Sequence, residues 1–248
     1  MSKGLVVITG ASSGFGEAAA LGFAKLGHPL FLGARRVERL REVAQACERA
    51  GSPEAGVQAL DVRSKESIES FCAEAGTPEI LLNNAGLALG RDHLAAMKDE
   101  DLVGMIETNV IGLVRVTRAL LPKMIAARRG HVINLGSYAA RGVYEGGAVY
   151  AASKHSVRVI SETLRLELSG TGIRVTEMDP GMAETEFSVV RLGDEASAKK
   201  VYEGWQPLTA ADVAEAIIWV ATRPPHVNIS EVVMTATAQA SLTKVHKG

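Results

Sequence analysis

Leu5-Val-Val-Ile8-Thr9-Gly10-Ala-Ser-Ser-Gly14-Phe-Gly16 joins a short apolar run to a glycine-rich turn, and residues 17–26, of helical composition, follow. Glycine lets a backbone turn sharply and approach a ligand, while a helix N-terminus offers free N–H groups and a partial positive charge. Strand, glycine-rich turn and helix in this order indicate a site for the phosphates of a dinucleotide. A plain strand-to-helix turn is the alternative, and the position at the first strand favours the binding site.

The next apolar run, Pro29–Leu32, predicts a second buried strand, and Ala34-Arg35-Arg36 follows it. In NAD-binding proteins an acidic residue at this point accepts a hydrogen bond from the adenosine ribose, whereas arginine accommodates a 2′-phosphate. Arg35 and Arg36 therefore predict NADP as the cofactor. The alternative is a solvated basic start to the helix predicted over 37–50.

Short apolar runs and helical stretches alternate along the whole chain, which predicts βαβ crossovers and a parallel sheet. Strands are expected at 5–8, 29–32, 57–60, 80–82, 131–135, 173–178 and 232–234, and helices at 17–26, 37–50, 64–75, 99–127, 149–169 and from Thr209 onward. The fold class is thus α/β, with a doubly wound parallel sheet of about seven strands and helices on both faces. Residues 1–248 are expected to form one domain. Ligands of such sheets bind beyond the carboxyl ends of the strands, where Gly10, Asp61 and Asn83 fall.

The composition is that of an ordinary globular protein. The chain has 248 residues, 47% of them hydrophobic, and a formal net charge of −1, which argues against a nucleic-acid or anionic-membrane partner. No apolar run is long enough to span a bilayer and no secretory leader is visible, so a cytoplasmic location is expected. Cys47 and Cys72 match no metal or redox spacing, and the six histidines show no paired metal spacing; we expect buried, reduced thiols and no catalytic metal.

Tyr150 and Lys154 stand four residues apart in a predicted helix, so both project from one face. A tyrosine hydroxyl with a pKa of about 10 is a poor base at neutral pH, and a neighbouring ammonium favours the phenolate. The spacing suggests a proton-transfer pair. Taken alone, the spacing is more typical of an ordinary solvated pair on a surface helix.

Asn109 interrupts the apolar face of the long helix predicted over 99–127. A buried asparagine needs hydrogen-bond partners, so it is either a satisfied structural amide or a residue that orders groups and water near the site. Residues 186–206 are polar and punctuated by glycine, which predicts a mobile lid or substrate loop.

Six motifs, in this order and over essentially the whole chain, resemble those of the short-chain dehydrogenase/reductase family: Thr9-Gly-x-x-x-Gly-x-Gly16, Asn83-Asn-Ala-Gly86, Asn109, Ser137, Tyr150-x-x-x-Lys154 and Pro180-Gly181. The resemblance implies a Rossmann-like fold in which Tyr150 is the general acid/base. Lys154 would lower the pKa of Tyr150 and hold the nicotinamide ribose, Ser137 would position the substrate oxygen, and Asn109 would link Lys154 to a water relay. Cofactor contacts are expected from Gly10, Ser12, Ser13, Gly14, Phe15, Gly16, Arg35, Arg36, Asp61, Val62, Asn83, Ala85, Gly86, Tyr150, Lys154, Pro180, Gly181 and Thr185.

Three further stretches, Asn84–Gly90, Thr185–Ser188 with Arg191, and Pro225–Ile229, resemble the NADP-dependent 3-hydroxy acid dehydrogenases, which include serine 3-dehydrogenase. This likeness implies oxidation of serine, allo-threonine or related 3-hydroxy acids. A guanidinium can hold a carboxylate through two parallel hydrogen bonds, so Arg191 and Arg141 are candidates for the substrate carboxylate, and Arg191 is our hypothesis.

Two alternatives remain open. A reductase of ketones, aldehydes or 3-oxoacyl thioesters would share every cofactor and catalytic residue. A regulator that senses NADP without turnover would not need Ser137, Tyr150 and Lys154. The family resemblance also implies a homotetramer, or a homodimer, formed through the helices predicted at 99–127 and 149–169.

Overall fold

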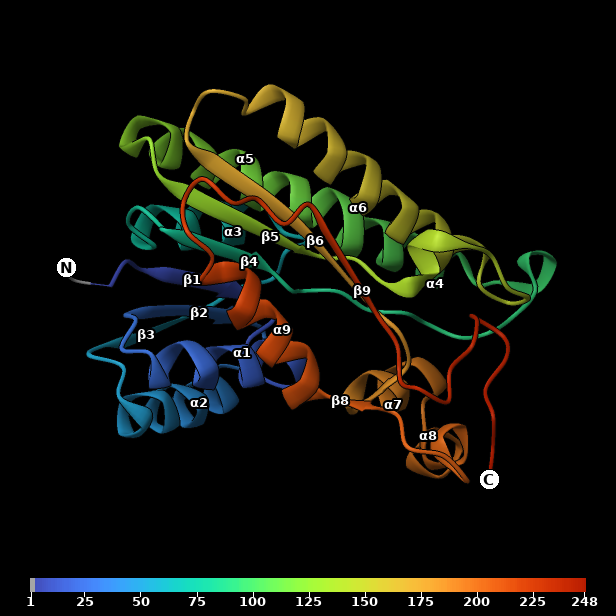
Figure 1. Cartoon of the computed structure of the whole chain (residues 1–248). Coiled ribbons are helices and arrows are strands. Elements are labelled where there is room, and N and C mark those ends of the chain that lie inside the picture. The colour runs from blue at the N-terminus through green and yellow to red at the C-terminus, as the bar shows by residue number, and fades with distance from the viewer. Residues whose placement is uncertain (1–2) are drawn as a thin grey trace.

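A computed structural model describes residues 3–248, and its core is one parallel sheet between two layers of helices (Figure 1). The strands run in the order β3-β2-β1-β4-β5-β6-β9, and every neighbouring pair is parallel. Their bounds are β1 (Val6–Thr9), β2 (Leu30–Ala34), β3 (Ala55–Ala59), β4 (Ile80–Asn83), β5 (Gly130–Leu135), β6 (Ile173–Pro180) and β9 (Glu231–Met234). The predicted fold class is confirmed.

The first strand shows why both faces of the sheet are covered. Val6 and Ile8 pack into the core on one face and Val7 into the core on the other, and all three are fully buried. A strand buried on both faces reads as a continuous apolar run, because successive side chains point to opposite sides.

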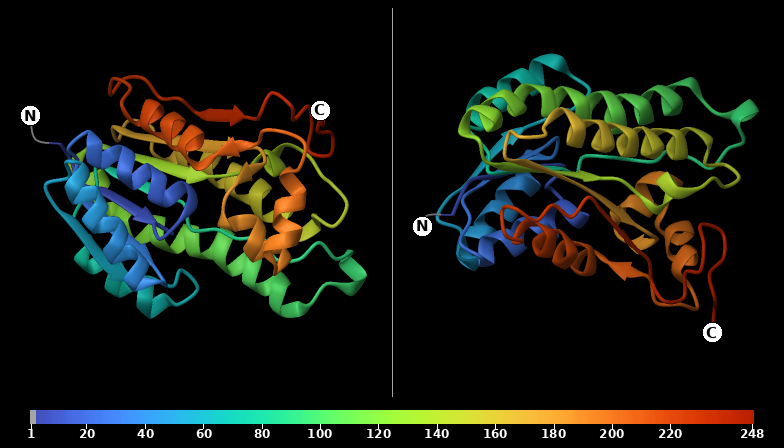
Figure 2. Two further views of the ribbon diagram at one scale, coloured as in Figure 1. Left: turned by 90° about the horizontal axis from the view of Figure 1, so that it is seen from below. Right: turned by 45° about the horizontal axis from the view of Figure 1, so that its top comes forward.

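Helices cover the two faces in two groups (Figures 1 and 2). The first face is covered by α1 (Gly14–Lys25), α2 (Val37–Ala50) and α9 (Ala210–Ala221). The second is covered by α3 (Lys65–Glu74), α5 (Leu113–Ala127) and α6 (Ala148–Glu167), with α4 (Asp99–Ile106) leading into α5. Cys47 and Cys72 are buried free thiols, as expected. Within residues 3–248, no helix has both the length and the apolar character to cross a bilayer.

The helix expected over 99–127 is interrupted by a π-helical segment, Glu107–Gly112, between α4 and α5. Periodicity alone predicted an unbroken helix, since the apolar positions continue through the segment. The π-helical turn contains Asn109, whose amide bonds Leu87 and Ser153 on neighbouring segments. Such turns are rare and often occur at functional sites.

The segment predicted as a loop, 186–206, contains two helices, α7 (Glu186–Leu192) and α8 (Glu195–Tyr202). They lie between the short parallel strands β7 (Ala183–Glu184) and β8 (Leu208–Thr209). Thr185 and Asp194 cap the two helices through their side chains. Thr185 and Asp194 are therefore sequence signals for helix starts. The loop prediction missed them because it relied on the polarity and glycine content of the segment.

Candidate active site

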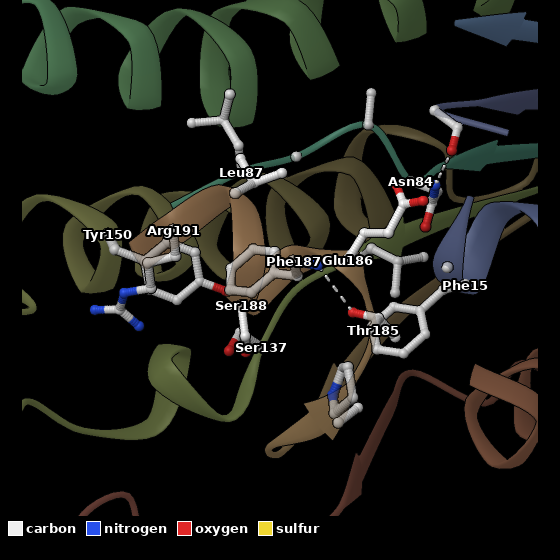
Figure 3. Close-up of a pocket in the computed structure, with 18 of the residues that line it drawn as sticks. Phe15, Asn84, Leu87, Ser137, Tyr150, Thr185, Glu186, Phe187, Ser188 and Arg191 are labelled. Atoms are coloured by element: carbon white, nitrogen blue, oxygen red, sulfur yellow. Dashed lines mark hydrogen bonds between the residues drawn. The ribbon is translucent and has the colours of Figure 1, made fainter. Parts of the chain in front are cut away.

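A cleft of about 610 Å³ lies at the carboxyl edge of the sheet, where β1, β4, β5 and β6 end. Helix α7 forms another of its walls, so residues far apart in the sequence meet there (Figure 3). Most of the expected cofactor-binding residues line the cleft: Gly10, Ser12, Ser13, Gly14, Phe15, Arg35, Arg36, Asp61, Val62, Ala85, Gly86, Tyr150, Lys154, Pro180, Gly181 and Thr185.

The turn after β1 has the backbone that a phosphate-binding turn needs. Gly10 and Gly14 have φ values of +67° and +59°, which side chains disfavour. A Cβ on Gly10 would lie 2.9 Å from the Cα of Ala85. Ser13 is the N-cap of α1, and within residues 3–248 its side chain accepts no hydrogen bond from that helix. The backbone donors of the first turn are therefore left for a ligand, and the site fits a dinucleotide.

Two of the expected cofactor residues do not line the cleft, and the structure corrects their roles. Asn83 is buried, and its amide donates to Thr117 Oγ1 at 2.8 Å and to Asn134 Oδ1 at 2.9 Å, so it fastens β4 to β5 and α5. Its neighbour Asn84 lines the cleft instead. Gly16 is a packing residue, since a Cβ there would lie 2.5 Å from Asn84 Nδ2.

Arg36 lies at the end of β2, beside the glycine turn. Its Nη2 atom donates to Ser13 Oγ at 2.7 Å and to Glu186 Oε2 at 2.8 Å. Together with Arg35 it places positive charge at the cleft wall, where no acidic residue follows the strand. These residues fit a dinucleotide that carries an additional phosphate.

Tyr150, Ser137 and Lys154 all line the cleft. Tyr150 is largely buried, and burial raises the pKa of its phenol to about 12, although the Ser137 hydroxyl lowers it. Lys154 Nζ lies 5.9 Å from the centroid of the Tyr150 ring and donates to Leu135 O at 2.7 Å. Burial lowers the pKa of Lys154 to about 8, against the attraction of Asp179 and Glu177.

The sequence therefore predicted the neighbours of Tyr150 but not the sign of its pKa shift. Lysine was expected to lower the pKa, yet desolvation of the phenolate is the larger effect in this structure. At neutral pH Tyr150 is a neutral phenol and can donate a proton.

Asn109 does not line the cleft, but it lies one residue layer behind it. Its Oδ1 accepts from Leu87 N at 2.8 Å, and its Nδ2 donates to Leu87 O at 2.8 Å and to Ser153 Oγ at 3.0 Å. A Cβ on Gly86 would lie 3.3 Å from Asn109 Oδ1 and 3.5 Å from Lys154 Nζ. Asn109 thus holds the loop after β4 beside Lys154, and its part in a water relay stays a prediction.

The two arginines considered for a substrate carboxylate lie in different places. Arg191 of α7 lines the cleft, with its guanidinium carbon 5.6 Å from the centroid of Tyr150 (Figure 3). Its Nη2 atom donates to Tyr144 Oη at 3.1 Å. Arg141 lies outside the cleft, and its guanidinium is bound to Asp179 and Glu231. This placement removes Arg141 as a substrate-binding candidate.

Several cleft residues were not named individually as site candidates, although some lie in stretches that the sequence analysis singled out: Asn84, Leu87, Arg91, Tyr144, Glu186, Phe187, Ser188 and Gln239. Phe187 packs on Tyr150 with ring centroids 5.8 Å apart. The polar character of 186–206 indicated that this segment faces a ligand. Which of its side chains point into the cleft depends on how helix α7 is rotated about its axis, and the sequence does not give that rotation. In the described part of the chain, no group of three or more His, Cys, Asp or Glu side chains is arranged to hold a metal ion.

Comparison with known proteins identifies the family. Residues 4–195 match the model of the short chain dehydrogenases, so the chain belongs to that family of oxidoreductases. It is 46% identical to the sulfoacetaldehyde reductase of Chromohalobacter salexigens, over 95% of this chain and 94% of the relative. It is 44% identical to the NADP-dependent 3-hydroxy acid dehydrogenase YdfG of Salmonella typhi, over 95% and 96% of the two chains. The closed form of a serine dehydrogenase complexed with NADP⁺ superposes with a TM-score of 0.92 and 42% identity, covering 98% of this chain and all of the other.

Proposed function

We propose that this protein transfers hydride between NADP and the hydroxyl-bearing carbon of a small 3-hydroxy acid of the serine or allo-threonine type. One observation carries the proposal: the Arg191 guanidinium lies beside the Tyr150 ring, inside the cleft that the glycine turn opens. A guanidinium there can hold an anionic group of the substrate while Tyr150 reaches its oxygen.

The cofactor is NADP, as two NADP-linked relatives and the two arginines after β2 support. Arg35 and Arg36 would hold the 2′-phosphate, and the glycine turn with the first turn of α1 would hold the pyrophosphate. When bound, NADP supplies or accepts the hydride.

The protein's own part is alignment and proton transfer. In reduction Tyr150, a neutral phenol at pH 7, donates its proton to the carbonyl oxygen and is then reprotonated from solvent; in oxidation it first loses its proton to solvent and, as the phenolate, accepts the proton of the substrate hydroxyl. Ser137 positions that oxygen. Lys154, whose pKa of about 8 keeps most of it charged at neutral pH, holds the cofactor ribose and stabilises the phenolate that proton donation leaves.

A second candidate is the reduction of a small aldehyde that bears a sulfonate. It is favoured by the relatives named sulfoacetaldehyde reductase, at 46% and 45% identity. Arg191 suits this candidate equally well, because a guanidinium pairs with a sulfonate as it does with a carboxylate. Reduction of neutral ketones, aldehydes or 3-oxoacyl thioesters leaves the charge of Arg191 without a use in substrate recognition.

The deciding experiment is a substrate panel with purified protein. NADP reduction is followed with serine, allo-threonine, 3-hydroxypropionate, 3-hydroxyisobutyrate, 2-hydroxyethanesulfonate and a neutral secondary alcohol, and each assay is repeated with NAD. A higher kcat/KM for carboxylates supports the 3-hydroxy acid, and a higher value for the sulfonate supports the second candidate. Preference for the neutral alcohol contradicts both, and the absence of turnover with every compound in either direction would favour an NADP-sensing regulator.

We further infer a cytoplasmic homotetramer, or a homodimer, built from the single domain 1–248 with residues 186–206 as the substrate lid. Val159 and Leu166 on α6 are 60% and 79% exposed, and an apolar outer face of this kind needs cover. Light scattering coupled to size exclusion tests the assembly, and a monomer at micromolar concentration contradicts it.

A further inference from the structure

Two buried carboxyl groups lie directly behind the candidate catalytic serine. Glu177 and Asp179 are both on β6, two residues apart, and both side chains point to the same face of the sheet. Each is fully buried. Burial of two carboxylates side by side is costly unless each finds a compensating charge or a proton.

Asp179 has such partners. Its Oδ1 accepts from the backbone N–H of Ser137 at 2.9 Å, and its Oδ2 accepts from Arg141 Nε at 2.7 Å. The first bond fixes the chain just after β5, where Ser137 turns toward Tyr150. A Cβ on Gly136 would overlap the Asp179 carboxylate, so glycine is needed for the backbone to lie this close.

Glu177 has none. Within residues 3–248 neither of its carboxyl oxygens has a hydrogen-bond partner, and the nearest guanidinium nitrogen, Nη2 of Arg141, is 3.8 Å away. Arg141 also pairs with Asp179 and, through Nη1 at 2.7 Å, with Glu231, and within residues 3–248 its Nη2 atom makes no hydrogen bond.

The charged groups around the pair come from four elements. Seen from Glu177, they are Asp179 on the same strand β6, Arg141 at the end of the 3₁₀ turn Tyr138–Arg141, Glu231 on β9, and Arg165 and Lys154 on α6. Arg165 pairs with Glu231 at 3.6 Å, so it does not serve Glu177. One guanidinium is thus shared among three carboxyl groups, which leaves the unpartnered one to take a proton.

We propose that Glu177 and Asp179 hold a single proton on Glu177, and that ionised Asp179 is a positioning residue that fixes Ser137 and keeps Lys154 charged. Because Glu177 is neutral, the carboxyl pair carries only one buried negative charge, on Asp179. Burial, and then Asp179, raises the pKa of Glu177 to about 8; burial also raises the pKa of Asp179, but there the hydrogen bond and charge of Arg141 and the backbone N–H of Ser137 oppose the rise.

The first test needs neither cofactor nor activity. Infrared difference spectra between about pH 6 and about pH 10 should show the C=O band of a protonated carboxylic acid at the lower pH, as expected for a carboxyl titrating far above its ordinary pKa. The band should be absent from Glu177→Gln, which replaces a neutral group by a neutral group of the same shape. A band that persists in Glu177→Gln, or is missing from the wild type at about pH 6, overturns the proposal.

The second test is kinetic and rests on the proposed function, since it uses whichever compound of the panel is turned over. Asp179→Asn, assayed at about pH 6 so that Lys154 stays charged, should lower kcat by about tenfold to a hundredfold with the KM for NADP nearly unchanged, because a misplaced Ser137 costs alignment and not cofactor binding. Asp179 raises the pKa of both Tyr150 and Lys154. The alkaline limb of the reduction rate should therefore move down by about one pH unit in this variant.

Glu177→Gln should keep a near-normal kcat at about pH 7, because the group it replaces is neutral there. Glu69→Gln is the control for removing a carboxylate charge, as Asp179→Asn does, since Glu69 lies exposed on α3. Equal loss of kcat in Glu177→Gln and Asp179→Asn, or an unmoved alkaline limb in a folded Asp179→Asn, contradicts the positioning role. If no compound is turned over, the proposed function fails, and the infrared test still decides where the proton lies.

Discussion

Arg36 Nη2 and Glu186 Oε2 lie 2.8 Å apart although 150 residues separate them in the sequence, and both residues line the same cleft. The pair ties the first turn of α7 to the end of β2. Both side chains are nearly half exposed, at 48% and 42%, so the contact contributes little to folding. The contact matters for cofactor binding, because the Glu186 carboxylate pairs with Arg36, which we propose binds the 2′-phosphate of NADP.

Glu186→Gln should therefore raise the affinity for NADP about threefold to tenfold, the effect of about 1 kcal/mol expected for removing a screened like charge. Affinity for NAD should stay the same, because that cofactor lacks the 2′-phosphate. Titration calorimetry with both dinucleotides measures the difference. Glu184→Gln, an exposed carboxylate on β7, is the matched control, and weaker NADP binding by Glu186→Gln would contradict the assigned role.

Tyr150→Phe should lower kcat by about 10²-fold to 10⁴-fold, the range for loss of a positioned acid. Cofactor affinity should be retained, because only one oxygen atom is removed. Steady-state rates and a binding titration give the two values. Tyr138→Phe is a useful comparison, since Tyr138 also lines the cleft; near-normal turnover in Tyr150→Phe would show that another group transfers the proton.

Arg191→Ala should raise the KM for acidic substrates about tenfold to a hundredfold, which corresponds to the loss of a charge-assisted pair. Turnover of the neutral secondary alcohol should change much less. The ratio of kcat/KM for the two substrates separates lost recognition from a displaced α7. Lys199→Ala removes a positive charge from α8 and should leave that ratio unaltered. Equal losses for both substrates would mean that Arg191 only supports the lid.

Glu177 should make stability fall as pH rises. Its pKa is about 8 in the folded protein and close to its ordinary 4.5 in the unfolded chain, so the folded state binds the extra proton between these values. The stabilisation is complete below about pH 4.5 and is lost as pH rises through about 8. Urea unfolding gives the difference in unfolding free energy between Glu177→Gln and the wild type. This difference should favour the variant more at about pH 9 than at about pH 5. A difference that is constant with pH would contradict the raised pKa of Glu177.

Gly10→Ala should destabilise the protein by about 2 kcal/mol or more and abolish NADP binding, because it combines a left-handed backbone with a collision. The new Cβ would lie 2.9 Å from Ala85 Cα. Gly27→Ala separates the two effects, since Gly27 has a φ of +78° with open space around it and should cost only about 1 kcal/mol. Thermal melts with and without NADP provide the comparison, and equal costs at the two positions would exclude the collision.

The sequence by itself was sufficient for the fold and for the place of the site. The patterns that predict them are local and can be read from short stretches of sequence. They are the apolar runs of the buried strands, the glycine turn before α1, and the spacing of Tyr150 and Lys154. A parallel sheet brings its strand ends to one edge whatever the detailed packing. Helix α2 was predicted at its observed bounds, 37–50, because its amphipathic pattern is complete within the helix itself.

Only the tertiary structure decided what depends on contacts between distant segments. Asn83 and Asn84 are identical side chains in adjacent positions, and the alternation of β4 turns one into the interior and leaves the other in the cleft. Arg141 and Arg191 were both candidates from the sequence, with Arg191 preferred for its place in the predicted lid; in the structure Asp179 on β6 binds Arg141, whereas Arg191 lies beside the rings of Tyr144 and Tyr150. The pKa of Tyr150 likewise follows from its burial, which no spacing along the chain records.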